Sequence, residues 1–257
     1  MQHGRTFNDV AALYHTQRVG YAAALFDDLQ AIAGLRPGDR VLEIGCGTGQ
    51  ATLGLAARGL DVTAIDPGPA LVELARQRFA DVPNVRFSLG SFEDWPLDPH
   101  PFRLVAAAQS WHWLDADMRF KKAAQALGPG GHLAIFGHTP LWSAELQTRL
   151  APIYRSLAPQ TWMPAPETWY MPEGPISGLF AASGFFAPAQ HKAYAWTHLY
   201  SAQSFIAYLA TRSDHNVLPQ DRRAALLAEV EKVLPETIEA DWMTNLYIAA
   251  LAQERIV

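Results

Sequence analysis

Residues 40–49, Arg-Val-Leu-Glu-Ile-Gly-Cys-Gly-Thr-Gly, decide the fold class of this chain. A short apolar run ends at Ile44, glycines follow at alternate positions, and a helical pattern begins at Gln50. Glycines there permit positive φ and let backbone N–H groups approach a ligand, while the N-terminus of the following helix favours a negative group. The segment therefore predicts a strand, a ligand-binding turn and a helix.

The same alternation continues through the first half of the chain. Four more apolar runs of strand length end in glycine, proline or polar residues, at 60–65, 85–89, 102–108 and 131–136. Helical patterns cover 50–58, 69–80 and 118–127. Regular alternation indicates parallel strands with right-handed crossovers. We predict an α/β fold: a doubly wound, mostly parallel seven-stranded sheet, Rossmann-like, with helices on both faces.

After residue 140 the composition changes. Residues 159–175 hold five prolines, two tryptophans and a tyrosine, which is typical of a loop that covers something. Beyond it, the patterns predict helices at 176–183, 201–211 and 220–234, and strands at 191–197 and 244–250. No second hydrophobic core is apparent. We therefore expect this half to complete the sheet and to lay helices over its edge.

Composition excludes several classes of partner. The 257 residues carry 20 Lys and Arg against 25 Asp and Glu, a formal charge of −5, so the basic surface of a nucleic-acid binder is missing. No apolar run reaches membrane-spanning length, so we expect no membrane association. One cysteine cannot form an internal disulfide, and the histidines show no ligand spacing. We expect a soluble, cytoplasmic protein without a metal.

Two familiar phosphate-binding loops fit the glycine segment poorly. Gln50 stands where the dinucleotide fingerprint has its third glycine, and no Gly-Lys-Ser or Gly-Lys-Thr follows to make a Walker loop. Asp66, at the end of the second predicted strand, would lie beside the glycine loop and could accept hydrogen bonds from both ribose hydroxyls. The alternative is that Asp66 is the N-cap of the helix that begins near Pro69.

Five ordered motifs resemble those of class I S-adenosylmethionine-dependent methyltransferases. They are residues 43–49, Asp66, Gly90-Ser-Phe-Glu93, the strand end with Gln109-Ser-Trp-His-Trp113, and Leu127-Gly-Pro-Gly-Gly131. Details also resemble the branch of trans-aconitate methyltransferase-like and ubiquinone-biosynthesis-like enzymes: Phe7, Tyr14, Arg18 and Tyr21, then Trp111-His-Trp-Leu114, 209–213 and 244–249. The resemblance covers most of the chain. It implies S-adenosylmethionine as cofactor and S-adenosylhomocysteine as product.

The resemblance implies a role for each matching residue near the methionine part of the cofactor. Glu43 and the glycines Gly45, Gly47 and Gly49 would surround it. Gln109 would offer a carbonyl to its ammonium group. Tyr14 and Arg18 would face its carboxylate, with the geometry of that segment altered by Val19, where the branch usually has proline.

The nucleoside part would be held by three further segments. By the same resemblance, Asp66 would bind the ribose hydroxyls and Pro67 would lie against adenine. Ser91 replaces the acid that usually reaches the adenine amino group, which leaves the backbone N–H of Phe92 to contact the ring.

His112 is the candidate catalytic residue. Methyl transfer from a sulfonium asks the protein chiefly for orientation and exclusion of water, and a general base matters only for an acceptor that keeps its proton. His112 follows the fourth strand and has a near-neutral reference pKa. The alternative, which we favour, is that it packs and hydrogen-bonds between two tryptophans. No Asn-Pro-Pro-Tyr or Asp-Pro-Pro-Tyr run follows that strand, which counts against nucleobase amino groups as acceptors.

We therefore expect a small-molecule acceptor, methylated on oxygen or carbon, with a carboxylate among the candidates. Five aromatic residues could line its pocket or cover the core: Trp142, Trp162, Trp169, Tyr170 and Trp196. The expected organisation is a single domain over 1–257, with N-terminal lid helices at 1–34, the cofactor-binding half at 35–140, and the acceptor lid and sheet completion at 141–257.

Two other functions remain open at the level of sequence. A non-catalytic S-adenosylmethionine-binding protein would show the same binding motifs, because the acceptor chemistry leaves no motif of its own. An NAD(P)-linked oxidoreductase would keep the fold, but Gln50 and Glu43 count against it. Monomer and homodimer are both compatible with the chain.

Overall fold

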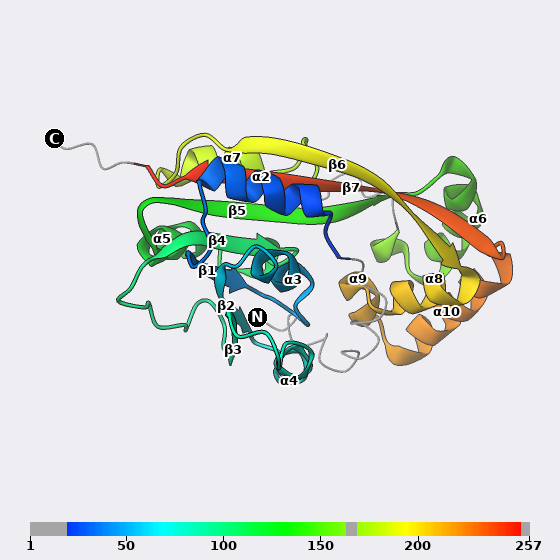
Figure 1. Ribbon diagram of the computed structural model, residues 1–257. Helices are drawn as coiled ribbons and strands as arrows, with labels where there is room; N and C mark the ends of the chain where they lie inside the picture. Colours follow the sequence, from blue (N-terminus) through cyan, green and yellow to red (C-terminus); the bar gives the residue numbers. More distant parts are fainter. Residues whose placement is uncertain (1–19, 163–168, 253–257) are drawn as a thin grey trace.

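A seven-stranded sheet forms the frame of the protein (Figure 1). The computed structural model describes residues 20–162 and 169–252. The strand order is β3-β2-β1-β4-β5-β7-β6, and β7 runs in the opposite direction to the other six strands. The strands are β1 (Arg40–Ile44), β2 (Asp61–Asp66), β3 (Val85–Leu89), β4 (Phe102–Ala108), β5 (Leu127–Leu141), β6 (Gln190–Ser201) and β7 (Thr237–Ala250). The predicted fold class is confirmed.

Helices connect the strands and cover both faces of the sheet. They are α2 (Ala23–Ala33), α3 (Gln50–Ala56), α4 (Pro69–Arg78), α5 (Arg119–Ala126), α6 (Ala144–Leu157), α7 (Ile176–Ser183), α8 (Ala202–Ala210), α9 (Ser213–Asn216) and α10 (Gln220–Val233). The described residues also include the short 3₁₀ helices η3 (Trp111–Trp113) and η4 (Pro159–Thr161). Left-handed glycines end α2 and α7, since Gly34 and Gly184 have φ of 61° and 73°.

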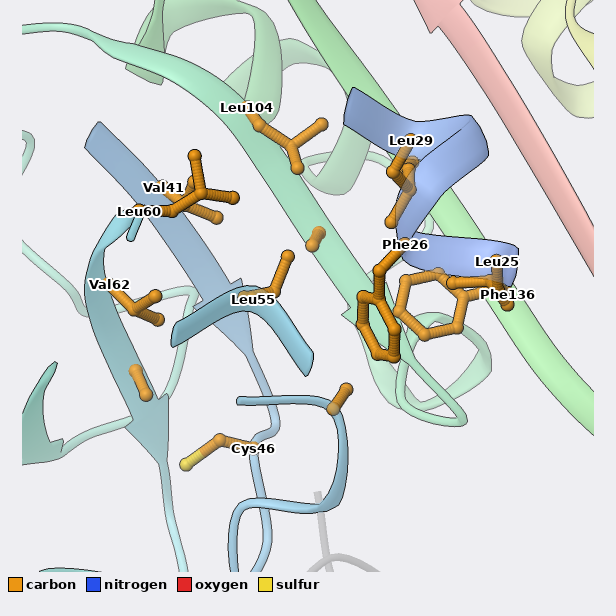
Figure 2. Packing of buried hydrophobic residues seen from close by; sticks show 14 of the residues in the cluster. Leu25, Phe26, Leu29, Val41, Cys46, Leu55, Leu60, Val62, Leu104 and Phe136 are labelled. Atoms are coloured by element: carbon orange, nitrogen blue, oxygen red, sulfur yellow. The ribbon is translucent and has the colours of Figure 1, made fainter. Parts of the chain in front are cut away.

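One face of the sheet packs against α2, α3 and α4. Alternate strand residues point to this face, and Phe26 of α2 lies beside Phe136 of β5, with ring centroids 6.3 Å apart (Figure 2). The glycine loop contributes Cys46 to this cluster, where burial raises the pKa of its thiol well above the usual value. Cys46 is therefore a small residue that fills the turn, without the lowered pKa of a nucleophilic thiol.

The opposite face packs against α5 and α7. Phe120, Ala123 and Ala126 of α5 lie in one apolar cluster with Ile176 and Phe180 of α7, over the other set of alternate strand residues. Trp111, in the 3₁₀ turn after β4, is completely buried in this cluster. Both faces of β1 and β4 are thus covered, which explains why their sequences are almost continuously apolar.

The expectation that the second half adds no core of its own is wrong. A separate apolar cluster joins α6, α8 and α10 to the ends of β6 and β7, at the right of Figure 1. Its members include Trp142, Leu150, Phe205, Leu226 and Trp242. β5, β6 and β7 are 15, 12 and 14 residues long and extend well beyond the predicted apolar runs. The helices of this cluster pack on these extensions.

The described parts of the chain contain neither a membrane-spanning helix nor a metal-binding cluster. There, no helix combines the length and the apolar character that crossing a bilayer requires. Over 20–162 and 169–252, no cluster of three or more His, Cys, Asp or Glu side chains is arranged to hold a metal ion.

Alanine substitutions at two helical glycines test how tightly the helices pack. A Cβ at Gly54 in α3 would lie 2.1 Å from Cε2 of Phe26, whereas one at Gly178 in α7 would meet nothing within 4 Å. We expect Gly54→Ala to lower the free energy of unfolding by about 1–3 kcal/mol, because the Phe26 ring must move. Gly178→Ala should raise it by about 0.5–1 kcal/mol through helix propensity and chain entropy. Urea unfolding of both variants measures the difference, and equal stabilisation by both would contradict the packing.

Candidate active site

Most of the predicted site residues meet at one edge of the sheet. The strand order β3-β2-β1-β4 places the carboxyl ends of four parallel strands side by side. The glycine loop follows β1, Pro67 follows β2, the segment 90–92 follows β3, and Gln109 follows β4. The chain reverses its direction of winding between β1 and β4, which is where ligands bind in open α/β sheets.

The Asp66 carboxylate braces the glycine loop. One oxygen accepts a hydrogen bond from Gly47 N at 2.9 Å and the other accepts one from Gly68 N at 2.8 Å. The N-cap position of α4 is Gly68, so the N-cap interpretation of Asp66 is wrong in detail, although its carboxylate does fix the turn before that helix. Burial raises the pKa of Asp66, and the two N–H donors oppose that rise.

Glu43 is a buried carboxyl group with one unused oxygen. Thr52 of α3 donates to Oε2 at 2.6 Å, while Oε1 has no hydrogen-bond partner among the described residues. Burial raises the pKa of Glu43 to about 8, the Thr52 hydrogen bond lowers it, and the neighbouring Asp66 raises it further. Glu43 thus brings a buried oxygen next to the glycine loop, with its capacity to accept a hydrogen bond still available.

The end of β4 has a constrained backbone. Gln109 has φ of 56°, which is uncommon for a residue other than glycine, and its side-chain amide donates to His138 O of β5 at 2.8 Å. A Cβ at Gly137 would lie 2.5 Å from Gln109 Oε1. Ser110 donates to Ile44 O at 2.5 Å, which joins the ends of β4 and β1. These contacts hold the Gln109 carbonyl in one orientation.

His112 lies in η3 and contacts two aromatic residues of the proline-rich segment. Its Nδ1 is 3.0 Å from the Tyr170 hydroxyl, and the Trp169 ring is 6.1 Å away between centroids. Burial lowers the pKa of His112 to about 4, and the positive charge of Arg119 lowers it as well. His112 is therefore neutral at pH 7 and a weak base.

The remaining predicted residues divide into three groups. Tyr14 and Arg18 lie outside the described residues, so their roles stay predictions. Pro67 is exposed beside the loop, whereas Phe92 is buried in the apolar cluster that includes α5. The Ser91 hydroxyl donates to Asp94 at 2.8 Å and accepts from Asp94 N, so it closes its own turn.

The five aromatic residues proposed for the acceptor pocket separate in the structure. Trp142 and Trp162 belong to the cluster around α6, and Trp196 stacks on Trp242 with centroids 5.3 Å apart. Of the five, Trp169 and Tyr170 are the two that lie against His112.

Comparison with known proteins agrees with this geometry. Residues 41–131 match a family described as a methyltransferase domain. A methyltransferase of Mycobacterium tuberculosis (strain ATCC 25618 / H37Rv) is 29% identical over 89% of this chain and 85% of its own length. A solved structure from Anaeromyxobacter dehalogenans, described as a type II methyltransferase, is 25% identical, with a TM-score of 0.66 and coverage of 91% of this chain and 97% of that one. The matched family, this relative and this structure together support an S-adenosylmethionine-dependent methyltransferase with the class I fold.

A more distant structure has the same fold as this methyltransferase. The phosphoethanolamine N-methyltransferase 2 of Haemonchus contortus, solved with S-adenosylhomocysteine, is 16% identical, with a TM-score of 0.54 over 96% of this chain and 58% of that one.

Four residues of this methyltransferase escaped the sequence analysis. Thr52 and Ser110 support the loop, Gly137 leaves room for Gln109, and Arg119 is buried beside His112. Thr52, Ser110 and Gly137 act through partners on other elements of the fold, so no local pattern marks their roles. Arg119 alone had a signal, because a charged residue on the apolar face of a helix requires an explanation.

The raised pKa of Glu43 predicts a pH dependence of stability. Between about pH 4.5 and 8 the folded methyltransferase keeps the Glu43 proton that the unfolded chain has lost, so its stability falls as the pH rises through this range. Glu43→Gln removes this titration and keeps an oxygen for Thr52. We expect similar thermal midpoints for the two proteins near pH 5, and a higher midpoint for the variant near about pH 8.5. Parallel midpoint curves across this range, measured without ligand, would rule out the raised pKa.

Proposed function

We propose that this methyltransferase moves the methyl group of S-adenosylmethionine to oxygen or carbon of a small-molecule acceptor. The observation that carries the proposal is the edge made by Glu43, the glycine loop, Asp66 and Gln109 at the reversal point of the sheet. The bound S-adenosylhomocysteine of the Haemonchus contortus enzyme supports the donor.

The residues at this edge fit the proposed cofactor. Gly45 has φ of 67°, and a Cβ there would lie 2.5 Å from Ser110 Cβ, so the loop backbone passes close to the end of β4. The unused Oε1 of Glu43 could accept a hydrogen bond from a cationic or hydroxyl group. The Asp66 oxygens hold two loop N–H groups and keep further lone pairs for ribose hydroxyls. When bound, the cofactor supplies an electrophilic methyl group on a sulfonium.

The acceptor needs little proton chemistry from this chain. In the transfer, an electron pair of the acceptor forms the new bond to the methyl carbon, and the electrons of the broken carbon–sulfur bond stay on sulfur. A pKa of about 4 makes His112 a poor base for an alcohol or phenol at neutral pH. This supports an acceptor that is already deprotonated, such as a carboxylate or a stabilised carbanion. His112 then contributes as a contact residue.

Two alternative functions are compatible with the fold: one uses a different cofactor, and the other binds S-adenosylmethionine without catalysing a transfer. An NAD(P)-linked oxidoreductase is disfavoured by Gln50, which stands where the dinucleotide fingerprint has its third glycine, and by the buried Glu43 carboxyl ahead of the glycine loop. A sensor that binds S-adenosylmethionine without turnover shares every feature of the edge. A cytoplasmic location, the absence of nucleic-acid partners and the choice between monomer and homodimer stay predictions from composition.

Replacing Asp66 tests donor binding. We expect Asp66→Ala to weaken S-adenosylhomocysteine binding by about 1.5–3 kcal/mol, because it removes a carboxylate acceptor and releases the Gly47 and Gly68 N–H groups. Isothermal titration with S-adenosylhomocysteine, S-adenosylmethionine and NADH measures the effect.

The matched control is Asp61→Ala at the opposite end of the same strand. Asp61 is partly exposed and pairs with Arg86 on the neighbouring strand, away from the glycine loop, so its loss should leave donor affinity unchanged. Unchanged affinity in Asp66→Ala, or tight binding of NADH alone, would overturn the donor site.

Turnover separates the enzyme from the sensor. We expect transfer of labelled methyl to at least one member of a panel of carboxylates, phenols, quinols and amines, with rates for deprotonated acceptors that stay level from about pH 5.5 to 7, below the range in which Glu43 ionises. This follows because His112 does not titrate in that range. Donor binding without transfer to any acceptor would favour the sensor.

A further inference from the structure

The contact between His112 and Tyr170 joins two distant parts of the chain beyond the end of β4. His112 follows β4, and Tyr170 comes 58 residues later, in the proline-rich stretch. The Nδ1-to-hydroxyl distance of 3.0 Å is that of a hydrogen bond, and the two rings meet edge to face with centroids 5.7 Å apart.

Tyr170 is itself held by two strands. Its side chain is buried, and its backbone oxygen accepts a hydrogen bond from the Tyr247 hydroxyl of β7 at 3.2 Å. Its ring lies against Gly137 of β5, where a Cβ would come within 2.7 Å of the ring carbons. The sheet therefore fixes where the Tyr170 hydroxyl stands, and that hydroxyl fixes one edge of the His112 ring.

The surroundings of His112 and Tyr170 determine which of the two side chains donates the hydrogen bond between them. Burial and Arg119 keep His112 neutral at pH 7, so only one ring nitrogen carries hydrogen. Arg119 is 5% exposed, forms no salt bridge within the described residues, and donates from Nη1 to Trp111 O at 3.2 Å. The positive charge of Arg119 favours negative charge density on the Tyr170 oxygen. That density increases when the Tyr170 hydroxyl donates a hydrogen bond to a partner. Tyr170 then donates to Nδ1, and the hydrogen of His112 is on Nε2.

We propose that Tyr170 is a positioning residue that holds His112 as a neutral donor, whose Nε2–H binds an oxygen of the methyl acceptor. The acceptor contact rests on the proposed function, whereas the tautomer does not. A donor at this place orients an oxyanion or carbonyl without removing a proton. The acceptor class is therefore a small molecule with such an oxygen at or next to the methylated atom.

Nitrogen-15 NMR of the histidine rings, with S-adenosylhomocysteine present at neutral pH, tests the tautomer directly. We expect His112 with hydrogen on Nε2 in the wild type. Tyr170→Phe removes only the hydroxyl and should give a mixture of tautomers. Tyr247→Phe is the matched control, because it removes a hydroxyl that holds the same residue without touching His112. Hydrogen on Nδ1 in the wild type, or the same tautomer in Tyr170→Phe, would overturn the proposal.

Two substitutions of His112 test the donor role in turnover. The amide of His112→Gln can donate from near the Nε2 position, whereas His112→Leu cannot donate. For an acceptor that the wild type methylates, we expect His112→Gln to keep kcat/KM within about tenfold and His112→Leu to lose about 10- to 100-fold, as for one hydrogen bond to a charged group.

The outcomes separate the two proposals. Equal losses in His112→Gln and His112→Leu would contradict the donor role, because a base cannot be replaced by an amide. Absence of methyl transfer by the wild type would contradict the proposed function instead, and the NMR measurement would still decide the tautomer.

Discussion

The Asp66 carboxylate is the interaction on which the cofactor edge depends. Its two hydrogen bonds tie the glycine loop after β1 to the turn after β2, so two loops from neighbouring strands become one surface. The backbone N–H groups of Gly45 and Cys46 bond Ile65 O, which leaves few loop N–H groups for a ligand. The proposed recognition of the cofactor at this edge therefore depends on carboxylates and carbonyls. These acceptors suit a ligand rich in hydroxyl and ammonium donors and are less suitable for a pyrophosphate.

Because β5, β6 and β7 extend beyond the central sheet, one sheet supports both the predicted cofactor half and the helical cluster around α6, α8 and α10. The inner part of β5 pairs with β4 and belongs to the cofactor half, while its outer residues, from Thr139 to Leu141, pair with β7 towards the helical cluster. Gln109 meets the same strand at His138, where the two parts join. The helical cluster and the end of β4 therefore share β5 as a common structural element.

The sequence predicted helices and strands well where one pattern of buried residues continues along the whole element. The parallel strands β1 to β4 were found to within one residue, because β1, β2 and β4 are mostly buried and apolar, and β3 is a short run bounded by turn residues. The ends of β5, β6 and β7 were missed, because outside the central sheet their buried and exposed residues alternate and Pro140 interrupts the run. In the site, glycines and Asp66 were predicted from motif spacing, whereas the Tyr170–His112 contact depends on tertiary packing that spacing does not encode.

Charge around the site bears on the class of acceptor. Glu43 and Asp66 are buried carboxyl groups on the donor side, and the charge of Asp66 makes ionisation of Glu43 harder, so this side favours a cation. On the other side, Arg119 is buried without a salt-bridge partner among the described residues, beside a neutral His112. A sulfonium donor and an anionic acceptor lose their charges together when the methyl group moves. Burial raises the free energy of separated charges more than that of neutral products, so under the proposed function these charges support an anionic acceptor over a neutral amine.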